Sequence, residues 1–296
     1  MTAPTGLSPQ TRGIILMAAV AFAIQIVDGL AKYLSADYSP LFIGWARYAA
    51  ASIIVLPYAF ARHGRHLFPA ERLGAHILRT VLLVTAMSLY FVAISHIPLA
   101  TAISAYFVAP VVAMVLSVVV LGERMTTRKG ISLALGFAGA MVILRPGVGT
   151  MEPGILLALA SGLAFACYMI VTRKAALESD PVKTLAFQCA LGAVLLMPQA
   201  LLTWSTPAWG DLVFFAGLGI FSLIGHLMLI IAFRLAETSV LAPLVYLELV
   251  GAALIGYLAF HEVPGPATIA GASLIVFAGL ILLWHNKSAT VEEPAA

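Results

Sequence analysis

Residues 153–172 read PGILLALASGLAFACYMIVT, a run of twenty residues without a charged side chain. An α-helix needs about 20 apolar residues to cross the hydrocarbon core of a bilayer. The run does not alternate between apolar and polar residues, as the strands of a membrane β-barrel do. This stretch therefore predicts a membrane-spanning helix.

The same pattern recurs along the whole chain, separated by short breaks that carry Pro, Gly or charge, such as 62–65 and 263–266. The first run is longer than the apolar part of a cleaved signal peptide and is expected to be the first span. We therefore predict an all-α membrane protein with ten transmembrane helices. The ten runs cover residues 12–34, 40–60, 73–95, 99–121, 129–145, 153–172, 182–203, 210–232, 238–260 and 266–285.

The composition agrees with a chain surrounded by lipid. Of 296 residues, 62% are hydrophobic and 10% are charged, against roughly 25% charged residues in soluble domains. The chain has no Lys/Arg-rich run with interleaved aromatic residues, so we expect no nucleic-acid partner. Cys167 and Cys189 lie in apolar runs without metal-ligand spacing, so we expect neither a metal site nor a cofactor.

The basic residues predict the orientation of the chain. With the N-terminus inside the cell, most of the 16 Lys and Arg residues, Arg79 among them, fall on the cytoplasmic side or its boundary. An even number of spans places both termini there. We expect a multi-pass protein of a bacterial-type inner membrane, in contact with membrane lipid.

An internal repeat divides the chain into two halves. Residues 120–123 and 137–139 resemble residues 259–262 and 277–279, at offsets of 139 and 140. Because each half would hold five spans, an odd number, the second half must be inverted in the membrane. Two inverted halves around a central site are typical of secondary transporters. The expected halves are residues 1–148 and 149–296.

These repeated residues carry a family resemblance. The first copy contains Ala109-Pro110, Gly122-Glu123 and the helix end at 137–144, and the second contains Ala242-Pro243, Tyr246, Gly256-Tyr257, residues 261–264 and residues 277–279. This pattern resembles the EamA-type repeat of the drug/metabolite transporter superfamily, although His261 stands where Gly is usual. The resemblance implies ten helices around a central cavity, and export or exchange of small metabolites. Within the superfamily, the chain is most similar to YddG-type bacterial amino-acid exporters.

Glu248 is the sharpest candidate for function, because it lies near the middle of the ninth run. A charge at the centre of a span costs roughly 2.5–3.5 kcal/mol on insertion scales, so it suggests function by default. One interpretation is a carboxylate that binds a substrate ammonium group or a coupling proton. The other is a protonated side chain that forms a hydrogen bond between helices.

Other polar residues inside the runs have a structural and a functional interpretation. Gln25 and Asp28 share one face of the first run, and Arg47 lies in the outer third of the second. Asp28 and Arg47 form either a structural ion pair or half of an outer gate. His226 either donates to a substrate carboxylate or is satisfied by a neighbouring helix.

Two tyrosines and a proline occupy notable places in the repeats. Tyr106 and Tyr246 lie at related positions and either line an amino-acid site or fill the space between helices. Pro110 is predicted to be a flex point for alternating access. Glu123 is interpreted as structural, with its expected basic neighbours being Arg124, Arg128 or Lys129.

The chain lacks the motifs of the competing classes. It contains neither HExxH nor GxGD nor a P-loop, so it is not expected to be an enzyme or an ATP-driven pump. We predict a secondary transporter or facilitator that exports small amino acids, with proton coupling left open; the alternatives are a cationic drug or a nucleotide-linked metabolite. A phosphate ester would require two or more buried basic residues, and this interpretation has Arg47 alone. The predicted site and gate residues are Gln25, Asp28, Arg47, Tyr106, His226, Tyr246 and Glu248.

Overall fold

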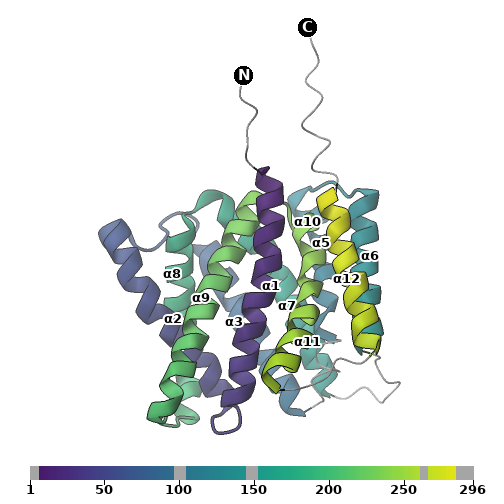
Figure 1. Ribbon diagram of the computed structural model, residues 1–296. Helices are drawn as coiled ribbons and strands as arrows, with labels where there is room; N and C mark the ends of the chain where they lie inside the picture. Colours follow the sequence, from purple (N-terminus) through teal and green to yellow (C-terminus); the bar gives the residue numbers. More distant parts are fainter. Residues whose placement is uncertain (1–6, 97–104, 145–152, 261–265, 285–296) are drawn as a thin grey trace.

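The computed structural model describes residues 7–96, 105–144, 153–260 and 266–284, and within these ranges every regular element is helical (Figure 1). Three short 3-10 helices are η1 (Gly64–His66), η2 (Trp209–Asp211) and η3 (Ala242–Tyr246). The α-helices are α1 (Pro9–Leu34), α2 (Pro40–His63), α3 (Leu73–His96), α5 (Val108–Leu121), α6 (Thr127–Leu144), α7 (Pro153–Glu178), α8 (Pro181–Leu202), α9 (Leu212–Leu235), α10 (Thr238–Leu241), α11 (Leu247–Phe260) and α12 (Pro266–Trp284).

Proline and capping residues start several helices where the sequence breaks predict. Proline is favoured in the first turn because its missing N–H has no partner there in any case. Asp180 caps α8, since its Oδ1 accepts hydrogen bonds from the backbone of Val182 at 2.9 Å and of Lys183 at 3.2 Å. The five helices that begin at proline are α1, α2, α7, α8 and α12.

Six helices are long and apolar enough to cross a membrane, namely α1, α2, α3, α7, α8 and α9. This confirms six of the ten predicted spans. Part of the predicted run 99–121 lies outside the described residues, and the run 238–260 is interrupted, because α10, η3 and α11 follow one another there. The count of ten spans therefore stays a prediction.

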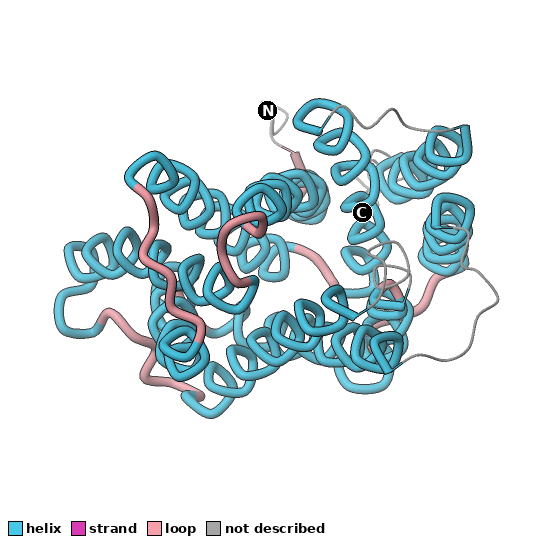
Figure 2. Tube along the Cα trace, turned by 90° about the horizontal axis from the view of Figure 1, so that it is seen from below, coloured by secondary structure: helices cyan, strands magenta, loops and turns pink. Residues whose placement is uncertain are grey.

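The main helix pairs join the two halves of the sequence in a two-fold pattern. α3 lies against α7, and the equivalent pair in the other half is α9 against α1. In the same way α5 packs on α7, and α11 packs on α1. α2 with α8 and α6 with α12 pair each helix with its own counterpart. The arrangement fits a two-repeat architecture, and Figure 2 shows the helices along their axes.

The two halves run in opposite directions. Gln10 in the first turn of α1 lines the same pocket as Lys174 near the end of α7. His76, near the start of α3, lies 2.9 Å from Ser179, which follows α7. We call this the terminal end of the bundle, because α1 begins and α12 ends there (Figure 1). Since α1 starts where its counterpart α7 finishes, the repeats are inverted.

The outer surface is apolar, as a lipid-facing surface requires. Ile53 is 75% exposed, Val119 is 76% exposed and Leu202 is 87% exposed. Polar side chains such as Arg79 and Gln188 are instead fully buried between helices. The bundle therefore hides its polar groups inside and presents hydrocarbon outside, the reverse of a soluble protein.

Candidate functional site

Two interrupted helices meet between the halves. The helix before α5 breaks at Phe107, and Pro110 follows in the first turn of α5 without an N–H for the carbonyl of Tyr106, four residues earlier. The related break is η3, which contains Pro243. The Tyr246 hydroxyl donates to the carbonyl oxygen of Phe107 at 3.2 Å. Breaks at corresponding places in two repeats point to a binding site nearby.

Arg79 is the most deeply buried cation near these breaks, with 0% of its surface exposed. It extends from α3 and donates to Gln188 Oε1 at 2.8 Å, and to the hydroxyls of Tyr168 and Thr172 at 3.3 Å each. All three partners are neutral and lie on the second half. Arg79 was predicted to lie on the cytoplasmic side or its boundary; the structure shows that it lies within α3 and is enclosed by α7 and α8.

Arg47 is a second buried cation, 4% exposed, on the neighbouring helix α2. It donates to the sulfur of Met87, and its guanidinium carbon lies 5.0 Å from the centre of the Tyr48 ring. In the described part of the chain Arg47 has no carboxylate within 4 Å. Asp28 accepts a hydrogen bond from Gln25 at 3.2 Å instead. The pair Asp28–Arg47 is thus not formed in this conformation, although the two charges interact.

His226, on α9, lacks a hydrogen-bond partner for either ring nitrogen among the described residues. The charges of Arg47 and Arg79 both act on it. Buried polar atoms without a partner are rare, and each costs about 1–3 kcal/mol. We call Arg47, Tyr48, Arg79, Gln188 and His226 the central cluster. Its unpartnered atoms are Arg47 Nε, the Tyr48 hydroxyl, Arg79 Nη1, Gln188 Nε2, His226 Nδ1 and His226 Nε2.

Two carboxylates form a separate acidic pair. Glu248, in the first turn of α11, is half-buried and interacts electrostatically with Asp28 of α1. Close approach of the two helices is possible because of Gly251, where an added Cβ would lie 2.8 Å from Gln25 Cγ. Within the described residues Glu248 makes no hydrogen bond. The pair consists of one group from each half.

An aromatic row connects the acidic pair to the central cluster. The rings of Tyr90 and Tyr106 lie 5.4 Å apart, Tyr106 and Phe165 lie 5.6 Å apart, and Phe165 stacks on Tyr168 at 5.6 Å. The charges of Asp28 and Glu248 act on Tyr90 and Tyr106. At the other end Tyr168 binds Arg79. The aromatic row therefore runs from Asp28 and Glu248 at one end to Arg79 at the other, while the charge of Arg47 also acts on Asp28.

The structure brings most of the predicted site residues to this place and adds others. Gln25, Asp28, Tyr106 and Glu248 surround the acidic end, while Arg47 and His226 belong to the central cluster. Tyr246 is fully buried, its ring pressed against Gly136, and it joins the two helix breaks. Arg79 and Gln188, which are hydrogen-bonded to each other, were not among the predicted site residues. The spacing of His76 and Arg79 on one face of α3 was the available signal.

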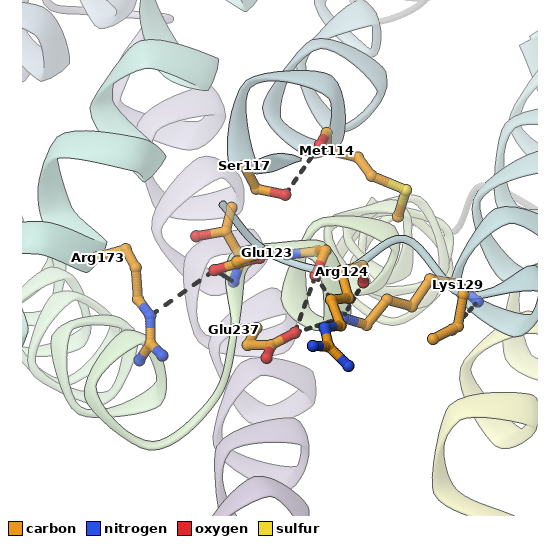
Figure 3. Close-up of polar contacts among 10 residues, drawn as sticks. Met114, Ser117, Glu123, Arg124, Lys129, Arg173 and Glu237 are labelled. Carbon is orange, nitrogen blue, oxygen red and sulfur yellow. Dashed lines mark hydrogen bonds and ion pairs between the residues drawn. The ribbon is translucent and has the colours of Figure 1, made fainter. Parts of the chain in front are cut away.

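A different set of charges lies at the terminal end, shown in Figure 3. Glu123 accepts hydrogen bonds from the backbone N–H groups of Thr238 at 2.9 Å and Ser239 at 2.8 Å, and lies 3.9 Å from Arg173 Nε. Lys129 pairs with Glu237 and donates to Ser239 Oγ at 2.7 Å. We call Glu123, Lys129, Arg173 and Glu237 the terminal network.

The terminal network links the two halves across an open pocket of about 910 Å³. Glu123 and Lys129 come from the first half, and Arg173 and Glu237 from the second. The expected neighbours of Glu123 were Arg124, Arg128 or Lys129, but its charged partner is Arg173, because the bundle brings α7 to the end of α5. The structural interpretation of Glu123 fits these contacts.

Comparison with known proteins finds one family twice in the chain. The model of the EamA-like transporter family matches residues 11–145 and residues 152–284. A Rickettsia felis S-adenosylmethionine uptake transporter is 29% identical over 88% of this chain and 89% of the relative. A riboflavin transporter of Vibrio cholerae is 25% identical, over 96% of this chain and 97% of the relative. The pseudopaline exporter CntI of Pseudomonas aeruginosa is 26% identical, over 93% and 97%.

A solved crystal structure has the same fold. It superposes with a TM-score of 0.80 over 95% of this chain and 99% of the other, at 19% identity. The helices that frame the central cluster therefore belong to a known arrangement.

Proposed function

The chain belongs to the EamA-like transporter family, and on this premise we propose that it exports small amino acids or related metabolites by alternating access. Transport of a small metabolite follows from the family and the named relatives. The choice of amino acids and the outward direction are the proposal.

One observation carries the choice of substrate: an aromatic row between the halves has Asp28 and Glu248 at one end and Arg79 at the other. Asp28 and Glu248 attract a cationic group, whereas Arg47 and Arg79 attract an anionic one. The aromatic rings from Tyr90 to Tyr168 suit an organic side chain. An amino acid carries an ammonium group, a carboxylate and a side chain, and so matches all three features.

The transport cycle proposed here uses both ends of the bundle. The terminal network joins the halves in this conformation, so opening toward the terminal end requires its contacts to separate. Pro110 and Pro243 mark the interrupted helices that we propose to bend during the cycle, and Glu248 is the proposed proton-coupling group. The basic loops support a location in a bacterial-type inner membrane with the terminal end in the cytoplasm.

A second candidate is a different small metabolite of the kinds that the relatives carry. The relatives are named for S-adenosylmethionine, riboflavin and pseudopaline, and one of them is an uptake transporter. These names favour a family that changes its substrate while keeping its fold. Both candidates share alternating access between the halves.

The test is flux through the purified protein in proteoliposomes. Vesicles loaded with labelled leucine, phenylalanine, S-adenosylmethionine or riboflavin are compared with and without a pH gradient, for wild type, Glu248→Gln and the control Glu71→Gln at an exposed loop position. We expect amino-acid efflux driven by the gradient, and loss of gradient dependence in Glu248→Gln alone.

Each contrary outcome removes a different part of the proposal. Flux of S-adenosylmethionine or riboflavin without amino-acid flux would replace the substrate and keep the transporter. Unchanged gradient dependence in Glu248→Gln would remove the coupling role of that carboxylate.

A further inference from the structure

The central cluster holds two buried guanidinium groups without a carboxylate partner. In the described residues Arg79 binds three neutral oxygens, and Arg47 binds the sulfur of Met87. A buried charge is costly unless an opposite charge compensates it. The positive charge of these two buried guanidinium groups is therefore uncompensated, and a negatively charged ligand would be bound favourably there.

The unpartnered atoms around these cations are mostly hydrogen-bond donors. Arg47 Nε and Arg79 Nη1 can only donate, and Gln188 Nε2 is a donor because the amide oxygen faces Arg79. The hydroxyl of Tyr48 and one nitrogen of His226 add two more. Each of these side chains is at least nine-tenths buried. Such a set of donors matches a ligand group that only accepts, and an ionised carboxylate accepts about four hydrogen bonds.

The helices that carry these donors pack against one another. α2 packs on α8 and α9, and α3 packs on α8. The ring of Tyr48 rests on Gly192 of α8, where an added Cβ would lie 2.6 Å from the ring. The charges of Arg47 and Arg79 act together on Cys189 and on His226. Four packed helices, two from each half, therefore carry the five side chains of the central cluster.

We propose that the central cluster is the carboxylate subsite of this transporter, with Arg79 and Arg47 as its main anion-binding groups. The substrate is accordingly a monocarboxylate, and its cationic group lies toward Asp28 and Glu248. A planar guanidinium pairs well with a planar carboxylate. The acidic pair disfavours a second negative charge on the ligand, which is why a carboxylate is preferred over a phosphate ester. The assignment rests on the proposed function only in naming the ligand as the transported substrate.

Binding to the purified protein tests the subsite separately from transport. The probes are phenylalanine, phenylalaninamide, 3-phenylpropanoate and phenyl phosphate, measured by calorimetry in detergent. Phenylalaninamide retains the ammonium group and the ring but lacks the carboxylate. We expect phenylalanine and 3-phenylpropanoate to bind, and phenylalaninamide to bind at least about tenfold more weakly, since a charge-assisted hydrogen bond contributes roughly that much.

Variants identify the residues responsible. Arg79→Met and Arg47→Met should each weaken binding of both carboxylates by about tenfold or more, while Arg79→Lys, which keeps the charge and loses the fork, should have a smaller effect. Arg65→Met at an exposed position is the matched control. If Arg79→Met does not fold, Arg79→Lys and Arg47→Met still decide the question.

Three results would overturn the subsite: carboxylate binding unaffected by the arginine variants, no carboxylate binding in wild type, or tighter binding of phenyl phosphate than of 3-phenylpropanoate. Carboxylate binding that depends on Arg79, without flux of any amino acid, would confirm the subsite and contradict the proposed function.

Discussion

The centre of the bundle and its terminal end both bury charged groups between the two halves, but they treat these charges differently. In the terminal network Glu123 accepts hydrogen bonds from two backbone N–H groups and forms an ion pair with Arg173. Lys129 forms an ion pair with Glu237. In the central cluster His226 and parts of Arg47 and Arg79 lack partners among the described residues. The charges at the terminal end are compensated in this conformation, whereas the centre keeps buried donors without partners, at a cost in stability.

The largest effect on stability is expected from Glu123→Ala. The change removes two hydrogen bonds to backbone groups of α10 and the ion pair with Arg173, so it should lower the free energy of unfolding by about 3 kcal/mol. Thermal unfolding in detergent measures this, with the exposed Glu71→Ala as the control. Equal melting temperatures for Glu123→Ala and wild type would show that the network does not hold the halves together.

Gly192→Ala should disrupt the packing of the central cluster without removing a charged group. Its Cβ would lie 2.6 Å from the Tyr48 ring, and an overpacked contact of this kind costs about 1–3 kcal/mol. We expect a lower melting temperature and weaker binding of 3-phenylpropanoate, because Tyr48 and Arg47 are displaced together. Gly74→Ala, where nothing lies within 4 Å, is the matched control. Unchanged binding of 3-phenylpropanoate to Gly192→Ala would show that Tyr48 does not contribute to the binding site.

His226→Leu should raise the stability of the protein, whereas the two substitutions above lower it. Among the described residues the histidine has no hydrogen bond to lose, and relief of its unpartnered nitrogens should raise the free energy of unfolding by about 1 kcal/mol. Transport should fall while the melting temperature stays level or rises. The two assays on the same purified sample check this. A clear loss of stability would mean that His226 has a structural role, which is the alternative that the sequence leaves open.

The smallest effect is expected at Lys129 and Glu237. The Glu237 side chain is 45% exposed, and a pair of this kind contributes about 1 kcal/mol or less. A double-mutant cycle with Lys129→Met and Glu237→Gln should give that coupling, and added salt should reduce it. A coupling of several kcal/mol would mean that this pair stabilises the contact between the halves as strongly as Glu123 does.

The sequence predicts the helices well and their partners poorly. The runs 40–60 and 153–172 became α2 and α7 because lipid demands long apolar helices, and proline marks their starts. The run 238–260 was predicted as one span, whereas η3, which contains Pro243, interrupts it. The burial of Arg79 was not predicted, because it depends on α7 and α8, which are distant in sequence. Local pattern gives the length of a helix, but contacts between the halves decide which charges are enclosed.

Because helices of the first half pack on helices of the second, these contacts form only after the second half has been synthesised. Tyr38 closes the end opposite the terminal end by donating to Asp211, which is 173 residues later in the chain. At a ribosomal speed of about 5–20 residues per second, α1 and α2 are inserted on the order of ten seconds or more before α9 exists. During that interval Arg47 lacks the helices that later enclose it. The enclosure of Arg47 therefore requires helices from both halves of the chain.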